Sequence, residues 1–135
     1  MGIEYTFYDY LDADNGGVNS INDWLNGEGK SAKAHFNQLI IYLEASPPPG
    51  SKDSVWHDPF TWPMKGDWKG FIELRKRGRI QYRLIAKIEN RDVFLVATGF
   101  HKGSYETDIT PGEGKERVEL MKKNPAKYRR KHDFR

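Results

Sequence analysis

The first third of the chain has the hydrophobic pattern of one strand followed by a helix. Residues 3–11, IEYTFYDYL, alternate between apolar or aromatic and polar side chains, which predicts a strand. Residues 12–17, DADNGG, have the composition of a turn. Residues 18–27 then predict a helix that begins at the N-cap Asn19 and ends at Gly27. Its apolar face consists of Val18, Ile21, Trp24 and Leu25.

The strongest helical periodicity lies in residues 31–46, SAKAHFNQLIIYLEAS. Ser31 is the expected N-cap, and PPPG at 47–50 is expected to end the helix. The apolar stripe consists of Ala32, Phe36, Leu39, Ile40 and Leu43. The two predicted helices form an αα-hairpin whose apolar stripe requires a sheet to cover it.

The middle of the chain predicts a loop and an antiparallel meander. Residues 51–66, SKDSVWHDPFTWPMKG, show no periodicity, and their two tryptophans predict an ordered loop that packs over the domain. Three strands are expected at 68–76, 80–89 and 92–100. Short polar turns, RGR and NR, join them, so neighbouring strands are expected to be antiparallel.

The last part of the chain predicts a helix and a basic tail. Residues 110–125 begin with a capping box, in which Thr110 is the N-cap, Pro111 occupies the first helical position and Glu113 the third. Residues 126–135, AKYRRKHDFR, are strongly basic and are expected to be mobile unless bound.

These elements predict an α+β fold in one domain, as is usual for 135 residues. An antiparallel sheet, made of the N-terminal strand and the three-stranded meander, is expected to pack on the αα-hairpin, with a short C-terminal helix. The domain is expected to span 1–125, followed by the tail at 126–135. The chain has no cysteine, no signal-peptide pattern at its start and no apolar run of membrane-spanning length, so a cytoplasmic location without a membrane partner is expected.

Charge is divided unevenly along the chain. Residues 1–64 contain three basic and nine acidic residues, whereas residues 65–135 contain nineteen basic and ten acidic ones. The net charges of −6 and +9 indicate a polyanionic partner for the second half, although a lopsided solvated surface would have the same composition.

The predicted hairpin at 73–88, ELRKRGRIQYRLIAKI, holds six basic residues and one acid. Because side chains on a strand alternate between faces, Leu74, Leu84 and Ala86 are expected to face the helices. The opposite face is then expected to carry Arg75, Arg83 and Lys87. The helices are expected to leave this face open. Guanidinium groups suit phosphate because their planar fork offers paired donors and keeps its charge.

The order of elements and a series of short motifs resemble the bacterial RelE/ParE/HigB toxin superfamily, and most of all its HigB-like, phage-related branch. Each motif is weak alone, and their order and spacing carry the resemblance across residues 3–123. The motifs are FYDYLD at 7–12, INDWL at 21–25, KAHFNQLIIYLE at 33–44, MKG at 64–66, GFIELR at 70–75, YRLI at 82–85, LVATGFHK at 95–102 and TPGEGKERVELM at 110–121.

The resemblance implies the toxin of a type II toxin–antitoxin system, neutralised by a cognate antitoxin that is expected to be of the helix-turn-helix type. In the ribonuclease members it implies metal-free cleavage of messenger RNA on the ribosome, in which the 2′-hydroxyl attacks. Such a site needs a base, an acid and cations around the phosphate. No cofactor and no metal are expected, since the histidines at 35, 57, 101 and 132 lack metal-ligand spacing.

Four residues are the candidate catalytic groups. Arg83 matches the strand arginine of the family and would stabilise the transition state, unless it only pairs with an acid such as Glu73. Arg75 is either a second phosphate clamp or a structural partner of an acid. His101 follows the last predicted strand and can act as base or acid near neutral pH. Tyr105 could donate a proton, stack on a base or simply pack.

Candidate RNA-binding residues surround this set: Lys102, Arg77, Arg79, Lys87, Lys65 and Lys69. Lys102 could also lower the pKa of the neighbouring His101. His57, in the irregular loop, is a weaker candidate, and His35 is expected to face solvent or to pack on its helix.

The sequence departs from the family at the first strand of the meander. Some ribonuclease members carry two alternating lysines there, whereas this chain has Phe71 and Glu73. Either Lys65, Lys69 or the histidines replace them, or the chain is no nuclease of that kind. Two alternatives therefore remain: a ParE-like inhibitor of DNA gyrase, which needs no catalytic groups, and a non-toxic phage-related relative that binds nucleic acid or another protein.

Overall fold

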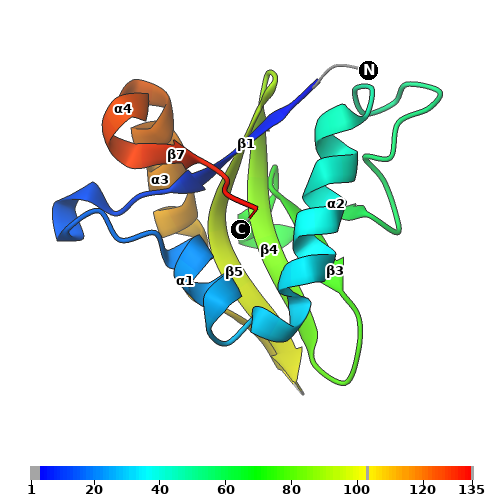
Figure 1. The fold of residues 1–135 in the computed structure, drawn as a ribbon, viewed down its shortest axis with the longest axis horizontal. Helices are drawn as coiled ribbons and strands as arrows, with labels where there is room; N and C mark the ends of the chain where they lie inside the picture. The colour runs from blue at the N-terminus through cyan, green and yellow to red at the C-terminus, as the bar shows by residue number, and fades with distance from the viewer. Residues whose placement is uncertain (1–3, 103, 135) are drawn as a thin grey trace.

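The fold is a mixed α/β arrangement around a mostly antiparallel sheet (Figure 1). The computed structural model describes residues 4–102 and 104–134, and the side chains at 100–105 lie outside the description. Within these residues the sheet has seven strands in the order β2-β3-β4-β5-β1-β7, and β6 pairs with β5. The strands are β1 (Thr6–Tyr10), β2 (Thr61–Pro63), β3 (Ile72–Lys76), β4 (Gln81–Glu89), β5 (Asp92–Lys102), β6 (Ser104–Thr107) and β7 (Arg129–Lys131).

The expected meander is present as β3, β4 and β5, but the N-terminal strand joins it differently from our prediction. β1 runs parallel to β5, with Thr6 beside Asp92 and Asp9 beside Leu95. The two helices between β1 and the meander make this direction possible, because they return the chain to the other end of the sheet. The fully antiparallel sheet expected from the sequence is therefore wrong at this one pairing.

The helices are α1 (Ser20–Asn26), α2 (Lys33–Ala45), α3 (Pro111–Lys123) and α4 (Pro125–Tyr128), with short 3-10 turns η1 (Ala13–Asn15), η2 (Lys30–Ala32) and η3 (Gly66–Trp68). The predicted caps of α1 and α3 are confirmed. The Asn19 side chain accepts a hydrogen bond from the Asn22 amide at 2.9 Å, and Thr110 and Glu113 form the capping box. Ser31 is not a cap, because it lies inside η2, which continues directly into α2.

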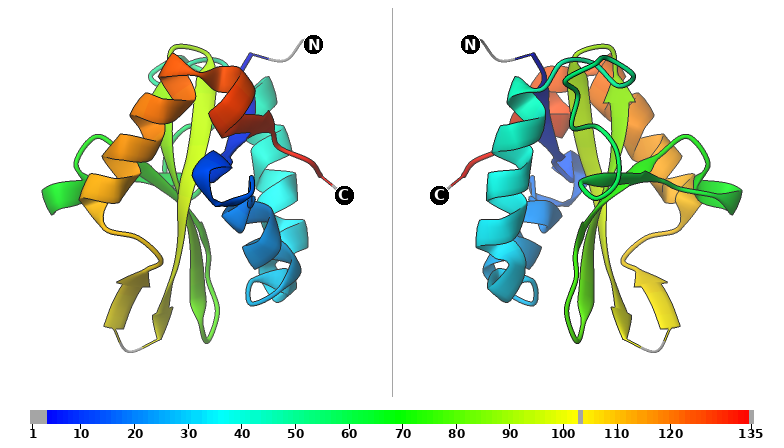
Figure 2. Two further views of the ribbon diagram at one scale, coloured as in Figure 1. Left: turned by 90° about the vertical axis from the view of Figure 1, so that its left-hand side faces the viewer. Right: turned by 90° about the vertical axis from the view of Figure 1, so that its right-hand side faces the viewer.

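Helices lie on both sides of the sheet (Figure 2). On one side, α1 and α2 contribute to a cluster with Phe7, Leu74, Leu84 and Leu95 at its centre. On the other side, α3 and α4 bring Val118, Met121 and Tyr128 onto β1, β4 and β5. Our prediction of an open second face is therefore wrong for the β1–β5 half of the sheet, since α3 carries an apolar stripe of its own.

The segment before β3 is more regular than expected. Trp56 packs in the core, with its ring 5.9 Å from that of Phe7, as predicted for an ordered loop. The same segment also supplies β2, which pairs with β3 at the sheet edge. β3 begins only at Ile72 rather than at residue 68, because η3 and the left-handed Gly70 (φ 97°) first turn the chain.

The C-terminal tail, which was expected to be mobile unless bound, is part of the sheet. β7 lies antiparallel to β1, with Asp9 opposite Arg130, so that the first and last strands of the sheet lie side by side (Figure 1). The chain here buries Tyr128 and His132, and this burial explains why a segment so rich in basic residues is held in place. Basic composition alone did not indicate that two aromatic rings of the tail are buried.

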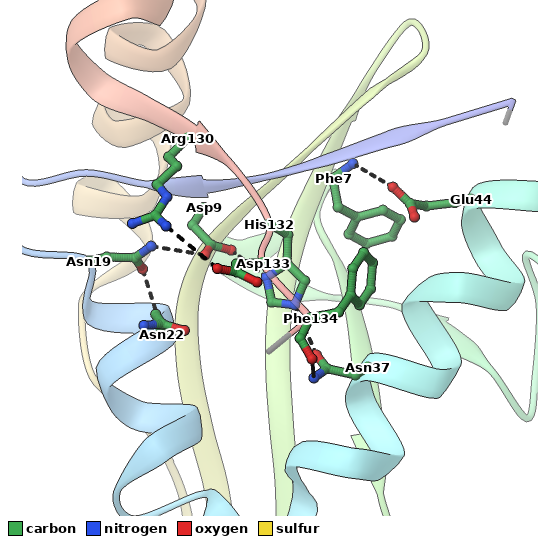
Figure 3. Close-up of polar contacts among 10 residues, drawn as sticks. All are labelled: Phe7, Asp9, Asn19, Asn22, Asn37, Glu44, Arg130, His132, Asp133 and Phe134. Carbon is green, nitrogen blue, oxygen red and sulfur yellow. Dashed lines mark hydrogen bonds and ion pairs between the residues drawn. The ribbon is translucent and has the colours of Figure 1, made fainter.

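A buried polar network fastens this tail (Figure 3). The Nδ1 atom of His132 lies 2.8 Å from Oδ1 of Asp9 on β1, and its Nε2 atom lies 2.9 Å from Oδ1 of Asn37 on α2. Asn37 also donates to the carbonyl oxygen of Phe134 at 3.2 Å, and Asp9 accepts from the side chain of Asn19 at 2.9 Å. The network thereby connects the first strand, both N-terminal helices and the C-terminal segment.

Among the residues that the structure describes, no helix has the length and apolar character needed to cross a membrane.

Candidate nucleic-acid interface

The two arginines singled out in the sequence lie on one face of the sheet. Arg75 on β3 is the direct cross-strand partner of Arg83 on β4. Leu74, Leu84 and Ala86 belong to the cluster on the α1–α2 side, as predicted from strand alternation. The arginines therefore share the opposite face, on the β2–β4 half of the sheet.

Glu73 lies between these guanidinium groups. Its Oε1 atom accepts a hydrogen bond from Nε of Arg75 at 2.5 Å and from Nη1 of Arg83 at 3.0 Å, and its Oε2 atom lies 2.9 Å from the same Nη1. Arg83 also donates to the side-chain oxygen of Gln81. Glu73 is 3% exposed and Arg83 is 7% exposed, whereas Arg75 is half-buried. The guanidinium groups of Arg75 and Arg83 thus share the single carboxylate of Glu73, and the cluster has a net positive charge.

Trp62 positions Arg75 from the edge strand. It pairs with Glu73 across β2 and β3, so its ring lies on the same face as the arginines. The guanidinium carbon of Arg75 lies 4.3 Å from the centre of the ring, and that of Arg77 lies 5.5 Å from it. A cation held over an indole ring in this way loses part of its freedom to rotate, and the contact is attractive.

A groove of about 560 Å³ opens beside the arginines. Its lining consists of Trp62, Pro63, Met64, Lys65, Trp68, Glu73, Arg75 and Arg83. Trp68 is fixed by an edge-to-face contact with Phe71, with 5.1 Å between ring centres, and it packs against Gly114 in the first turn of α3. The groove therefore combines apolar ring surfaces with cations, a combination that suits nucleotides.

A second groove, of about 380 Å³, shares Trp62 and Arg75 with the first. It is lined by these two residues together with His35, Leu39, Pro59, Phe60, Lys76 and Arg77. The Nε2 atom of His35 lies 3.0 Å from the carbonyl oxygen of Arg75, so α2 contacts the end of β3 here. We call the first the Trp68 groove and the second the His35 groove.

The structure brings together some of the predicted residues and separates others. Arg75, Arg83 and Lys65 line the Trp68 groove, and Arg77 lines the His35 groove. Arg79 lies exposed in the β3–β4 turn, and Lys69 is exposed after η3; neither belongs to the lining of these grooves.

Lys87 shares the face of the arginines but lies near the other end of β4. It is paired with Phe94 across the strands, and its Nζ atom lies 3.8 Å from Glu89. His57 is exposed and lines neither groove. Its Nδ1 atom lies 2.7 Å from the carbonyl oxygen of the next residue, Asp58.

The candidates at the end of β5 can be placed only by their backbone. His101 is the cross-strand partner of Gln81 on β4 and of Tyr105 on β6, and Lys102 follows it at the end of β5. The side chains of His101, Lys102 and Tyr105 lie outside the described residues. The register of β5 nevertheless places His101 and Lys102 one strand away from the end of β4 that carries Arg83, and Tyr105 on β6 lies one strand further.

Four residues of the Trp68 groove were not identified as candidates from the sequence: Trp62, Pro63, Met64 and Trp68. The available signal was the pair Trp56 and Trp62 in the irregular segment, which predicted an ordered loop packed over the domain but not a groove. Glu73 was considered only as a partner for the arginines, and the structure places it at their centre.

A pocket of opposite charge lies on the α1–β6 side of the molecule. Its lining of Trp24, Glu28, Glu106 and Asp108, with Thr98, Gly99 and Thr107, encloses about 390 Å³. Burial raises the pKa of Asp108, although the amide of Thr98 donates a hydrogen bond to its carboxylate at 2.9 Å. This pocket does not suit a polyanion.

Among the described residues, no group of three or more histidine, cysteine, aspartate or glutamate side chains is arranged to hold a metal ion. Comparisons of the chain with models of protein families, with curated proteins and with solved structures find no match.

Proposed function

We propose that this chain is the toxin of a type II toxin–antitoxin system and cleaves messenger RNA on the ribosome. The observation that carries the proposal is the cluster in which Arg75 and Arg83, opposite one another in the sheet, meet the carboxylate of Glu73 beside a groove. Guanidinium groups fixed on a rigid sheet provide the positive charge that a cleaved phosphodiester requires.

The proposed reaction uses the 2′-hydroxyl of the substrate as nucleophile. Arg75 and Lys65, the more exposed cations of the Trp68 groove, bind the non-bridging phosphate oxygens. The phosphate then competes with Glu73 for the guanidinium of Arg75, and the carboxylate accepts the proton of the 2′-hydroxyl. The bond from the 2′-oxygen to phosphorus forms, and the bond from phosphorus to the 5′-oxygen breaks.

The leaving 5′-oxygen takes up a proton, so the products are a 2′,3′-cyclic phosphate and a 5′-hydroxyl. His101 is the proposed acid, with Tyr105 as the second candidate, because His101 lies on β5, the strand next to Arg83, and Tyr105 is its cross-strand partner on β6. Arg83, which is buried against Glu73, stabilises the charge of the pentacoordinate phosphorus.

The arrangement of elements supports the proposal further. One strand, two helices, a three-stranded antiparallel meander and a capped helix follow in the order that the resemblance to the toxin superfamily implies, with the short strands β2 and β6 on either side of the meander in the chain. In the proposed toxin, α1 and α2 form the αα-hairpin on which the sheet packs. A cognate antitoxin of the helix-turn-helix type is the proposed partner.

A second candidate is a ParE-like gyrase inhibitor without nuclease activity. The observation that favours it is the burial of Arg83, which is 7% exposed and bonded to both oxygens of Glu73. An ion pair of this kind can serve the fold alone.

The test is induced expression in bacterial cells, followed by mapping of messenger RNA 5′ ends. We expect cuts that depend on translation and keep a fixed position relative to the reading frame. Arg75→Ala, at a half-buried position, should abolish the cuts while the thermal unfolding of the purified variant stays close to that of the parent. Arg79→Ala, an exposed arginine of the same hairpin, is the matched control. Growth arrest with intact transcripts and rising DNA damage signals would instead support the gyrase inhibitor.

A further inference from the structure

Trp62 lies at the junction of the two grooves. Both the Trp68 groove and the His35 groove include Trp62 and Arg75 in their lining. The tryptophan belongs to β2, the three-residue edge strand supplied by the irregular segment before β3. Two neighbouring hollows therefore meet at one aromatic ring and one cation.

Each groove has the size and lining of a site for a small planar ligand. Their volumes, about 560 and 380 Å³, fall within the usual range of roughly 300–1,000 Å³ for small-molecule sites. Each adds an apolar or aromatic surface of its own, Trp68 with Met64 in one and Phe60 with Leu39 in the other. A nucleobase is planar and stacks on such surfaces whatever its identity.

Cations accompany both grooves. Lys65 belongs to the Trp68 groove, Lys76 and Arg77 belong to the His35 groove, and Arg75 belongs to both. The carboxylate in the lining of the two grooves is Glu73, which is 3% exposed and bonded to arginines. The accessible charge is therefore positive along the whole path from one groove to the other.

We propose that the two grooves bind two consecutive nucleotides of single-stranded RNA, with Trp62 as the stacking residue between them and Arg75 on the phosphate that joins them. This inference rests on the proposed function, since it assigns the substrate strand to the groove that holds Arg75 and Arg83 and to the neighbouring groove beside α2. The ligand is single-stranded because a base within a duplex cannot expose its flat face to an aromatic side chain.

An extended acidic peptide is the competing occupant, because carboxylates would also meet Lys76 and Arg77. RNA is favoured because Arg75 belongs to both grooves. A phosphate that joins two nucleotides requires a cation at that point, whereas a peptide does not. RNA is also favoured by Trp62, whose ring lies 4.3 Å from the guanidinium of Arg75 and so places a stacking surface beside a phosphate ligand.

The test measures binding without cleavage. DNA-type oligonucleotides of one to four nucleotides, which lack the 2′-hydroxyl nucleophile, are titrated into the full chain by calorimetry. Affinity should rise markedly from one nucleotide to two and little afterwards. Trp62→Ala should weaken binding of the dinucleotide roughly 5- to 150-fold, corresponding to the usual contribution of one base–aromatic stack. Trp62→Phe should restore most of the loss.

Two further variants keep the inference testable if Trp62→Ala fails to fold. Arg77→Ala, at an exposed position, should weaken binding of the dinucleotide but not of the mononucleotide. Tyr42→Ala removes an aromatic ring that is 54% exposed on α2 and lines neither groove, so it should change nothing.

Three results would overturn the inference: equal binding by Trp62→Ala and the parent, equal binding of a duplex and a single strand, or displacement of the dinucleotide by a poly-glutamate peptide at lower concentration than by a longer oligonucleotide. The proposed function fails separately. Trp62-dependent binding without cleavage in cells would refute only the nuclease, and cleavage without Trp62-dependent binding would refute only the nucleotide subsites.

Discussion

Arg75 lies directly opposite Arg83 on neighbouring antiparallel strands, and both guanidinium groups donate to the carboxylate of Glu73. Like charges at directly opposite positions normally destabilise a sheet. Here the shared carboxylate compensates for the repulsion, so the three residues act as one unit. Their effects on stability should accordingly depend on one another.

Removal of Glu73 should therefore cost more than removal of its partners. Glu73→Met leaves the buried Arg83 without its carboxylate, and such a loss typically lowers the free energy of unfolding by about 3–5 kcal/mol. Arg83→Met should cost less, because Arg75 still pairs with Glu73. In the double variant the loss should fall short of the sum by about 1–3 kcal/mol.

Urea unfolding followed by tryptophan fluorescence measures all three variants. Lys87→Met, which removes the partially exposed pair with Glu89 at 3.8 Å, is the control and should cost less than about 1 kcal/mol. Additive losses in the double variant would show that the cluster does not act as a unit.

Substitution of Gly114 by alanine should lower the stability of the protein, whereas the same substitution at Gly112 should raise it. A Cβ atom at Gly114 would lie 2.6 Å from Cζ3 of Trp68, whereas at Gly112 the nearest atom is Oγ1 of Thr110 at 3.9 Å. Gly112→Ala should stabilise the protein by up to about 1 kcal/mol through helix propensity. Gly114→Ala should destabilise it by about 1–3 kcal/mol, because Trp68 must move.

The two glycine variants are compared by thermal unfolding. Since Trp68 lines a groove, Gly114→Ala should also weaken dinucleotide binding, and Gly112→Ala should not. A stabilising Gly114→Ala would mean that Trp68 has room to move away from α3.

The buried polar network around His132 should keep the C-terminal segment bound to the sheet. His132→Ala removes both ring contacts, so that Asp9, which is 1% exposed, loses one hydrogen-bond partner and keeps the side chain of Asn19 at 2.9 Å. We expect a loss of about 1–3 kcal/mol in the free energy of unfolding, as for other buried groups left unsatisfied.

Trypsin digestion followed by mass spectrometry tests this prediction locally. Cleavage after the basic residues of β7 should become faster in His132→Ala. Asp133→Ala is the neighbouring control, since it leaves the contacts of His132 with Asp9 and Asn37 intact. Equal digestion of parent and His132→Ala would contradict a fastening role.

Glu44 should make stability depend on pH. Burial raises the pKa of its carboxyl group, although the Phe7 amide, Lys131 and His132 act in the opposite direction. A carboxyl group whose pKa is raised in the folded state stabilises the fold at low pH. This contribution is lost as the pH rises from the unfolded-state pKa, about 4.3, through the folded-state pKa.

Glu44→Gln, which cannot ionise, should therefore be more stable than the parent at pH 7 and approach it below about pH 4. Urea unfolding at a series of pH values measures the difference. A difference that stays constant with pH would exclude Glu44 as its source.

Strand periodicity predicted the most useful feature of the interface. Alternation alone placed Arg75 and Arg83 on one face and Leu74 and Leu84 on the other, since the period of two leaves no other choice within a continuous pair of strands. The capping box at Thr110 was equally readable, because its hydrogen bonds join residues only three positions apart.

Features that depend on distant residues escaped prediction. β2 and β7 have three residues each, too few for a periodic signal, and each is held by a partner strand elsewhere in the chain. The direction of β1 depends on Asp92 and its neighbours. The Trp68 groove depends on contact between η3 and α3, which no local pattern encodes.

The position of β1 between β5 and β7 has a consequence for how the molecule assembles. Its hydrogen-bonding partners, residues 92–95 and 129–131, are synthesised long after it, and the contact between Asp9 and His132 spans 123 positions. Contacts of such high order slow folding. The first strand to be synthesised is thus among the last to form its strand pairs. Until then its two edges are unpaired and can bind incorrect partners.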